Sequence, residues 1–569
     1  MQQCGLWLES NTFVLLRLTS GNSTTGAFRI LIPPKSSIGV AVATIRRVTA
    51  RQKLEISLLV GAVAVTRLTF RSRDLYDLDS VNFALGMDHF DTRIHQPHPP
   101  GYFLYICIGR LVNLLVHDAN LALVLVSVAA SMATVAIIYL LAQEWFGTRA
   151  AQVAGILFLL SPLAWFHGTV ALTYSVEAAF SALLGYLCWR IHKGAAAFVV
   201  PAAIALGVSA GIRPSSLLFL GPLFLFSLWS VPIRKSLLGL SVLALTGAAW
   251  FLPMIQISGG FENYFGALVS LWRMVPSKNT VFNSPLANSL ARACFIAFIY
   301  FLCFGFASLA PLLAPREPEV SQKTRTVFTA VWVLPALCFF TFIYLKFVNS
   351  GYLLLVAVPG CVWIGHWIAD WYDRARWPRA VRLTLLTLCA AVNVAIFLAF
   401  PAYCSFRSVR RFEAELNGVK EAMPQVGAPS DLLVVSFDNH FLGYRHAGYY
   451  LPSYLTIEYP EAHLAEGTRI FAMQGRSTEL LPALPAGAWS RFVLFPLPAG
   501  NAEYAHYVDD VVKLLPAKDL QTTVLNGHPF VTAPICDLPL LFPPGPLAAG
   551  DSILGKGAPD ATALKPARP

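Results

Sequence analysis

The sequence predicts an α-helical polytopic membrane protein with a small C-terminal α/β domain outside the membrane. Of its 569 residues, 56% are hydrophobic and 13% are charged, and the mean hydropathy is +0.59. Soluble domains carry about 25% charged residues, so this chain has too little charge to cover a soluble surface. Disorder is excluded as well, because it requires low hydrophobicity. After Phe400 the composition becomes polar and turn-rich, which marks the extramembrane domain.

The N-terminal residues 1–53 are expected to form a poorly ordered cytoplasmic extension. They mix short apolar stretches with Ser, Thr, Gly and scattered Arg, and they lack the charged, apolar and cleavage regions of a signal peptide. Arg51 and Lys53 directly precede the first long apolar run. Because cytoplasmic loops are enriched in Lys and Arg, the N-terminus is predicted to face the cytoplasm.

About eleven apolar runs between residues 54 and 403 are long enough to cross roughly 30 Å of hydrocarbon. They are 54–70, 119–143, 151–167, 174–190, 195–211, 214–231, 236–256, 291–314, 327–346, 352–371 and 383–402. The loops on one side hold most of the cations, among them Arg149, Arg190, Arg234, Arg316 and Arg374. These loops are predicted to be cytoplasmic, and an odd number of spans then places the C-terminus outside. The net charge of +11 is accordingly attributed to topology and not to nucleic-acid binding.

The run 101–116 would be a twelfth span, but Arg110 and Asn113 interrupt it. Counting it as a span would reverse every later loop and move the arginine clusters outside. We therefore predict an amphipathic helix that lies in the outer membrane interface.

Residues 404–542 are predicted to form a periplasmic α/β domain. Strand-like runs lie at 432–437, 468–473 and 491–497, and Asn526-Gly527 between two apolar runs is a hairpin signal. The tail 543–569 is rich in Pro, Gly and Ala and is predicted to be disordered. Whether Cys404 and Cys536 pair is left open.

The first outer loop, 71–118, carries the strongest functional signal. Its segment 71–105 contains five aspartates and three histidines beside the membrane, interleaved with apolar residues at helical spacing. Acids at such a position are costly to desolvate and are functional candidates; the alternative is a solvated polar loop. Asp77-Leu78-Asp79 is formally a DxD motif, but the nucleotide-binding domain that this motif serves does not precede it.

Two motifs in this loop resemble a known family. D-S-x-x-x-A-L-x-M at 79–87 is followed by H-P-P-G-Y-F at 98–103. This order resembles the first outer loop of GT-C fold glycosyltransferases that use polyprenyl-phosphate sugars, such as the protein O-mannosyltransferase and lipid A aminoarabinose transferase families. Asp79 matches the family's acidic residue and His98 opens the second motif. The chain departs from the family at Ser80, where a glutamate is common.

The resemblance implies an inverting transfer of a sugar from a polyprenyl-phosphate donor to an acceptor hydroxyl, at the outer face of a bacterial inner membrane. The acceptor is a protein, a lipid or a glycan. Asp79 is the expected general base, with Asp77 as the second choice. No cofactor is expected, and a divalent metal ion is possible but not favoured. Nucleic acid is not an expected partner.

The remaining site candidates come from their predicted outward position. His98, Arg213 and Lys346 are expected to bind the lipid phosphate, since developing negative charge requires nearby donors. Glu177, Tyr174 and His95 are expected to line the substrate cavity. The simpler alternatives are that Asp79 only caps a helix, that His98 is structural, and that Tyr174 belongs to an aromatic belt.

Two other classes of function remain. The first is a transporter or flippase of lipid-linked sugars, for which charged or broken helices at mid-bilayer and paired repeats are typical. The second is a non-catalytic membrane scaffold whose exported domain carries the function.

Overall fold

The computed structural model describes residues 49–274, 280–313, 320–400, 404–459, 470–496 and 508–542. The predictions for residues 1–48 and for the tail 543–569 therefore lie outside the described residues. The first helix begins at Ala50, before the predicted start at residue 54, because Thr49 and Gln52 form a capping box that stabilises its first turn.

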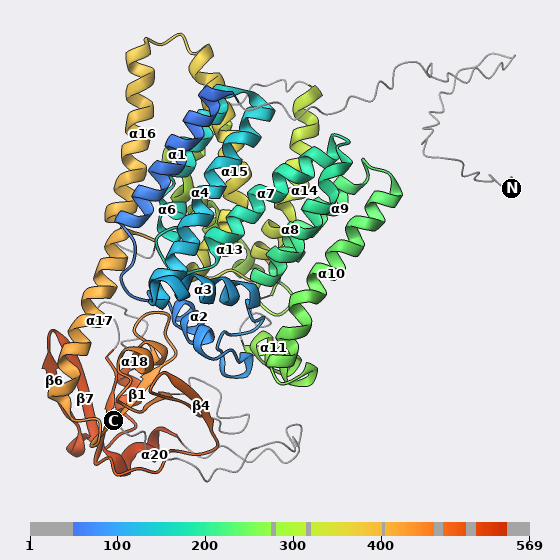
Figure 1. The fold of residues 1–569 in the computed structure, drawn as a ribbon. Helices are drawn as coiled ribbons and strands as arrows, with labels where there is room; N and C mark the ends of the chain where they lie inside the picture. The colour runs from blue at the N-terminus through green and yellow to red at the C-terminus, as the bar shows by residue number, and fades with distance from the viewer. Residues whose placement is uncertain are drawn as a thin grey trace, which may run out of the picture. The chain divides into compact units, whose positions relative to one another are not determined.

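Each of the eleven predicted spans contains a helix, and Figure 1 shows these helices gathered in one bundle. They are α1 (Ala50–Thr69), α4 (Ala119–Phe146), α5 (Thr148–Leu159), α6 (Pro162–His167), α7 (Tyr174–His192), α8 (Val199–Ile212), α9 (Ser215–Leu228), α10 (Ile233–Ile257), α13 (Leu286–Phe304), α14 (Val320–Phe342), α15 (Leu354–Arg374) and α16 (Arg379–Ala399). Within the described ranges, six stretches are long and apolar enough to cross a bilayer: 119–146, 233–257, 286–312, 322–342, 348–374 and 379–399.

Two of the predicted spans are interrupted helices. The run 151–167 divides at Ser161 and Pro162 into α5 and α6, because proline at the first helical position cannot donate a backbone hydrogen bond. The run 291–314 passes from α13 into the 3-10 helix η3 (Gly305–Leu313) at Gly305. A side chain there would collide with Asn393 of α16, and the backbone has a positive φ of 54°, so the sequence requires glycine.

The bundle is fixed by interhelical contacts at its centre. Trp332 of α14 is fully buried against Gly185 of α7, where a Cβ atom would overlap the indole ring. The indole nitrogen donates to Ser181 Oγ at 3.0 Å, and Ser181 donates to the carbonyl of Leu355 at 2.8 Å. These bonds connect α14, α7 and α15 and leave the indole nitrogen satisfied in an apolar interior.

The two ends of the bundle differ in charge. One end holds ion pairs between Arg190 and Glu144 at 3.3 Å and between Arg149 and Asp373. Arg190, Glu144 and Asp373 lie near the C-terminal ends of α7, α4 and α15, respectively, and Arg149 lies at the start of α5. The opposite end contains the start of α4 and of α7 and the end of α8, and it carries the helices of the loop 71–118.

That loop folds into α2 (Leu78–Asp88), the 3-10 helix η1 (Thr92–Ile94) and α3 (Phe103–Val116). In Figure 1, α3 lies crosswise to α4 at the end of the bundle where α2 and α11 (Phe261–Met274) are found. Helix α3 buries Tyr105 and Ile106 and exposes Leu114 and Leu115. The predicted amphipathic helix at 101–116 is therefore present; its position in a membrane interface stays a prediction.

The C-terminal region forms the predicted small α/β domain. Its long helix is α17 (Phe406–Val426), and its short helices are α18 (Tyr444–Tyr450) and α20 (Leu538–Leu541). The strands are β1 (Leu432–Phe437), β2 (Thr456–Tyr459), β3 (Ile470–Gln474), β4 (Ser477–Leu481), β5 (Arg491–Leu494), β6 (Gln521–Leu525) and β7 (His528–Pro534). They form one mixed sheet of order β4-β3-β2-β1-β5-β7-β6, in which β1 is parallel to β2 and β5.

The strand predictions are confirmed. The run 432–437 is β1, the runs near 470 and 491 are β3 and β5, and Asn526-Gly527 connects β6 to β7. Both turn residues have positive φ, as a tight hairpin turn requires. Cys404 is buried beside Ser350 and Cys536 is exposed, and both thiols are free.

Candidate active site

The first turn of α2 presents two carboxylates that have different tasks. Asp77 is the N-cap: its side chain accepts a hydrogen bond from the backbone N–H of Asp79 at 2.9 Å. Asp77 is buried, whereas the side chain of Asp79 is 21% exposed. The alternative that Asp79 only caps the helix is therefore wrong, because the N-cap is Asp77. The carboxylate of Asp79 makes no helix-capping hydrogen bond.

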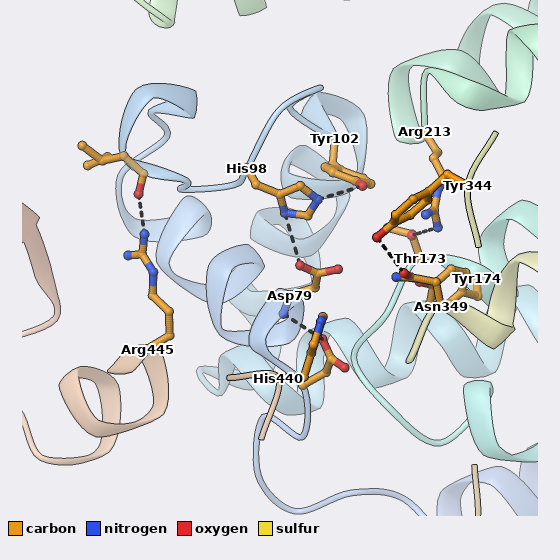
Figure 2. A network of polar contacts seen from close by, with 12 residues as sticks. Asp79, His98, Tyr102, Thr173, Tyr174, Arg213, Tyr344, Asn349, His440 and Arg445 are labelled. Atoms are coloured by element: carbon orange, nitrogen blue, oxygen red, sulfur yellow. Dashed lines mark hydrogen bonds and ion pairs between the residues drawn. The ribbon is translucent and has the colours of Figure 1, made fainter. Parts of the chain in front are cut away.

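Asp79 faces His98 across the loop. The Nδ1 atom of His98 lies 3.2 Å from Oδ1 of Asp79, and its Nε2 atom lies 3.0 Å from the hydroxyl oxygen of Tyr102. Burial raises the pKa of Tyr102 well above its ordinary value of 10, so the hydroxyl keeps its proton. Figure 2 shows His98 in contact with Tyr102 on one side and with Asp79 on the other, with the second oxygen of Asp79 turned away from His98.

Beyond Tyr102, the contacts continue to a buried arginine. Arg213 lies just after α8 and is enclosed by aromatic rings, with its guanidinium 3.9 Å from the centre of Tyr352, 4.6 Å from Tyr174 and 5.9 Å from Tyr102. Cations are attracted to the faces of such rings, more strongly when they are desolvated. The three rings form a cage and therefore stabilise the buried guanidinium.

Two polar partners hold the guanidinium in this cage. Arg213 donates from Nη1 to Thr173 Oγ1 at 3.0 Å, and the same nitrogen lies 3.7 Å from Oε2 of Glu177. Both members of the ion pair are buried, with side chains 5% and 1% exposed. Glu177 therefore balances the charge of Arg213.

A second set of polar contacts closes the cage on the side of α15. Asn349, in η4 (Phe347–Leu353), donates to the hydroxyl of Tyr174 at 3.2 Å, and Tyr344 donates to Asn349 Oδ1 at 3.3 Å. Figure 2 shows Tyr344, Asn349, Tyr174 and Arg213 together beside Asp79, His98 and Tyr102.

The α/β domain contacts the same loop. Arg445 of α18 is fully buried and donates to the carbonyl of Ile94 at 2.6 Å and to Thr478 Oγ1 at 2.8 Å. Tyr450 accepts a hydrogen bond from the backbone N–H of Leu75 at 2.7 Å. His440, in the loop after β1, lies with Nδ1 3.8 Å from Oδ1 of Asp77.

The structure brings most of the predicted site residues together. Asp77, Asp79 and His98 form one group, and Arg213 with Glu177 and Tyr174 forms the adjoining one. His95 lies apart from both: its ring packs against Phe471 of β3 with centroids 5.5 Å apart. Burial, together with the charge of Arg445, lowers the pKa of His95 to about 3.

Lys346 is exposed and precedes η4, the segment that supplies Asn349 and Tyr352. It has no ion pair with a residue in the described part of the chain. The roles of all these residues in catalysis stay predictions; the structure gives their positions.

Sequence reasoning missed several residues of the site. Tyr102 belongs to the H-P-P-G-Y-F motif and lies four residues after His98, so the motif itself contained the signal for it. Tyr352 is not among the residues that the sequence singled out. Asn349, in η4, and His440, in the loop after β1, lie far along the chain, and no local pattern connects them with residue 79.

Among the described residues, no group of three or more His, Cys, Asp or Glu side chains is arranged to hold a metal ion. The acids of the first loop are instead engaged individually, Asp77 as a helix cap and Asp91 with Arg93 at 2.7 Å.

The comparisons with known proteins agree on the fold. Residues 91–236 match the sequence profile described as protein O-mannosyl-transferase TMEM260 N-terminal domain. The crystal structure of ArnT from Cupriavidus metallidurans in the apo state superposes with a TM-score of 0.51 at 14% identity, covering 84% of this chain and 97% of ArnT. The chain has the GT-C glycosyltransferase fold. The predicted resemblance to GT-C glycosyltransferases is thereby confirmed at the level of the fold.

The same ArnT bound to undecaprenyl phosphate also has a TM-score of 0.51, at 12% identity, and covers 85% of this chain and 98% of its own. The oligosaccharyltransferase of Archaeoglobus fulgidus, in a complex with Zn and sulfate, is more distant: its TM-score is 0.41 at 13% identity, covering 70% of this chain and 61% of its own. No curated protein sequence matches the chain.

Proposed function

We propose that this GT-C protein is a glycosyltransferase that moves a sugar from a polyprenyl-phosphate donor to an acceptor hydroxyl, with Asp79 as general base and inversion at the anomeric carbon. The observation that carries the proposal is the series of contacts from Asp79 through His98 and Tyr102 to Arg213. It connects a partly exposed carboxylate to a buried cation at the end of the bundle opposite the arginine-rich loops.

The chemistry requires both ends of that series of contacts. The acceptor oxygen attacks C1 of the sugar as Asp79 takes its proton, and the bond between C1 and the phosphate oxygen breaks. The polyprenyl phosphate leaves with the electron pair and gains negative charge, which Arg213 stabilises across the cage. A positioned carboxylate contributes roughly 10²–10⁴-fold to such a step.

His98 is proposed to orient the base. A hydroxyl proton of Tyr102 donated to Nε2 leaves the proton of the imidazole on Nδ1, where it faces Asp79. His98 then faces one oxygen of the carboxylate, and the other oxygen is available to the acceptor.

The donor class is supported by the likeness to ArnT, one structure of which contains undecaprenyl phosphate. The acceptor, whether protein, lipid or glycan, stays open. The proposed mechanism uses no cofactor, because the leaving group is already a phosphate; Glu177, Tyr174 and His95 are proposed to shape the substrate cavity.

The proposal is tested by incubating the purified protein with radiolabelled polyprenyl-phosphate sugars and membrane extract. We expect label to pass from the lipid to an acceptor that stays labelled after lipid extraction, and transfer slower by roughly 100-fold or more with the Asp79→Asn variant. Movement of labelled lipid across vesicles without transfer would instead support the transporter alternative, and neither activity would support a scaffold.

The orientation is proposed from the charge of the two ends. The end with Arg149, Arg190 and Arg374 is placed in the cytoplasm, and the site and α/β domain on the outer face of a bacterial inner membrane. A reporter that is active only in the periplasm, fused after Tyr403, is expected to be active. A reporter signal confined to the cytoplasm would contradict the eleven-span count and place the α/β domain inside.

A further inference from the structure

The loop that follows β1 in the α/β domain lies against the first turn of α2. Strand β1 is flanked by β2 and β5, both parallel to it, so its carboxyl end lies at the position where open α/β sheets place ligand-binding loops. In this protein the loop 438–443 contacts the membrane domain there: the carbonyl of His440 accepts a hydrogen bond from the backbone N–H of Leu78 at 2.9 Å.

The imidazole of His440 makes a second, independent contact with the same turn. Its Nδ1 atom is 3.8 Å from Oδ1 of Asp77, which is the same oxygen that accepts from the N–H of Asp79. Asp77 is buried, and His440 is the only described residue within ion-pair distance of it. Figure 2 shows the imidazole of His440 beside this turn.

The charges around His440 favour its protonated form. Burial alone would lower the pKa of His440, but Asp77 and Asp79 on α2 and Asp438 on its own loop outweigh burial and raise the pKa to about 8. The neighbouring His446 of α18 opposes this only weakly, because burial lowers its own pKa to about 3 and it stays neutral. At neutral pH the α/β domain therefore presents a cation to the cap of α2.

We propose that His440 is a positioning residue of the active site: its imidazolium holds the carboxylate of Asp77, and through that cap it fixes the direction in which Asp79 leaves the helix. The proposal rests on the proposed function of Asp79. It makes the α/β domain part of the active site, since the cation that neutralises the cap comes from the other side of the domain boundary.

The separation of 3.8 Å exceeds the usual length of a hydrogen bond between N and O, so the contact acts mainly through charge. A buried carboxylate without a cation is costly, and the first turn of α2 would adjust to expose Asp77. A shift of the base by even a fraction of an ångström reduces turnover, because proton transfer requires hydrogen-bond distance to the acceptor.

The test uses His440→Asn and His440→Ala in the full-length protein. Both variants keep the backbone contact with Leu78, and asparagine also keeps an N–H group near the position of Nδ1, but neither can carry a charge. We expect kcat at pH 7 to fall about tenfold in both, with the KM for the lipid donor unchanged. His89→Asn, at the exposed opposite end of α2, is the matched control and should behave as wild type.

The pH profile separates positioning by charge from a packing role. As the pH rises through about 8, wild-type His440 loses its proton, so wild-type kcat should decline toward that of the two variants, which should show no such decline. If both His440 variants have the same kcat as wild type at every pH, the proposal for His440 is overturned. The proposed function is then unaffected. A variant defect of the same size at pH 7 and pH 9 would also overturn the proposal for His440, since packing does not titrate. A wild-type protein that transfers no label would instead overturn the proposed function.

Discussion

Replacing Asp79 by asparagine is expected to lower kcat by roughly 100-fold or more while the protein still folds and binds the lipid donor. The loss has the magnitude of a missing general base, because an amide cannot take the proton of the acceptor hydroxyl. The structure favours a well-folded variant: the cap of α2 is Asp77, and its bond is to the backbone of residue 79, which the substitution keeps. Single-turnover transfer of labelled sugar measures the chemical step directly.

Asp77→Asn is the comparison that assigns the base within the pair. Asparagine is as good an N-cap as aspartate, so α2 should persist, and turnover should fall less than in Asp79→Asn. If Asp77→Asn were inactive and Asp79→Asn nearly normal, the base would be Asp77 and the mechanism would stand. If both variants retained turnover, the first loop would not be the catalytic centre, and Glu177 would be tested next.

The sequence was sufficient to predict most of the fold because apolar runs and alternating loop charge are strong, local signals. All eleven predicted spans contain helices, and the α/β domain follows where the composition changes. What the sequence did not predict was the interruption of helices at Pro162 and Gly305, whose cause is local backbone geometry and, at Gly305, a contact with a residue far along the chain.

The site was predictable where its residues lie in one loop. Asp79 and His98 come from the first loop, and the structure places them 3.2 Å apart. His95 comes from the same loop, yet its ring packs against Phe471, because three residues along an irregular loop can change the direction of a side chain completely. Whether His95 lines the substrate cavity is still a prediction.

The residues that complete the site come from contacts between distant segments. His440 reaches Asp77 from a separate domain, and Asn349 reaches Tyr174 from the segment before α15. Nothing in the local sequence around either residue specifies its partner, because tertiary packing alone brings them together. Arg213 was predicted as a lone outward cation; its aromatic cage and its pairing with Glu177 were not.

The second large effect is expected at Arg213, and the structure changes how it must be tested. Arg213→Ala removes the guanidinium from a buried ion pair and leaves Glu177 as an uncompensated buried carboxylate. Breaking a buried pair by removing one partner costs about 3–5 kcal/mol. The single variant should therefore lose thermal stability as well as activity, and a loss of activity alone would not identify a phosphate-binding residue.

The informative variant combines Arg213→Ala with Glu177→Gln. The amide of glutamine keeps a hydrogen-bond partner for Ser216, which lies 3.5 Å from Oε1 of Glu177, and removes the stranded charge. We expect the double variant to regain most of the melting temperature. Its KM for the polyprenyl-phosphate donor should stay about tenfold above wild type, as for the loss of a hydrogen bond to a charged group. Glu177→Gln alone is the matched control for the effect of that substitution.

Lys346 and His98 are the other two residues proposed to bind the lipid phosphate, and they differ from Arg213 in burial and in their contacts. Lys346→Ala removes an exposed side chain, so stability should not change, and a smaller rise in donor KM would show that the lysine reaches the phosphate. His98→Ala should lower kcat as well, because His98 also contacts Asp79. An interaction made equally in the ground and transition states changes KM and leaves kcat nearly constant. Donor kinetics that match wild type in the Lys346 and His98 variants and in the stabilised Arg213 double variant would show that the phosphate binds elsewhere.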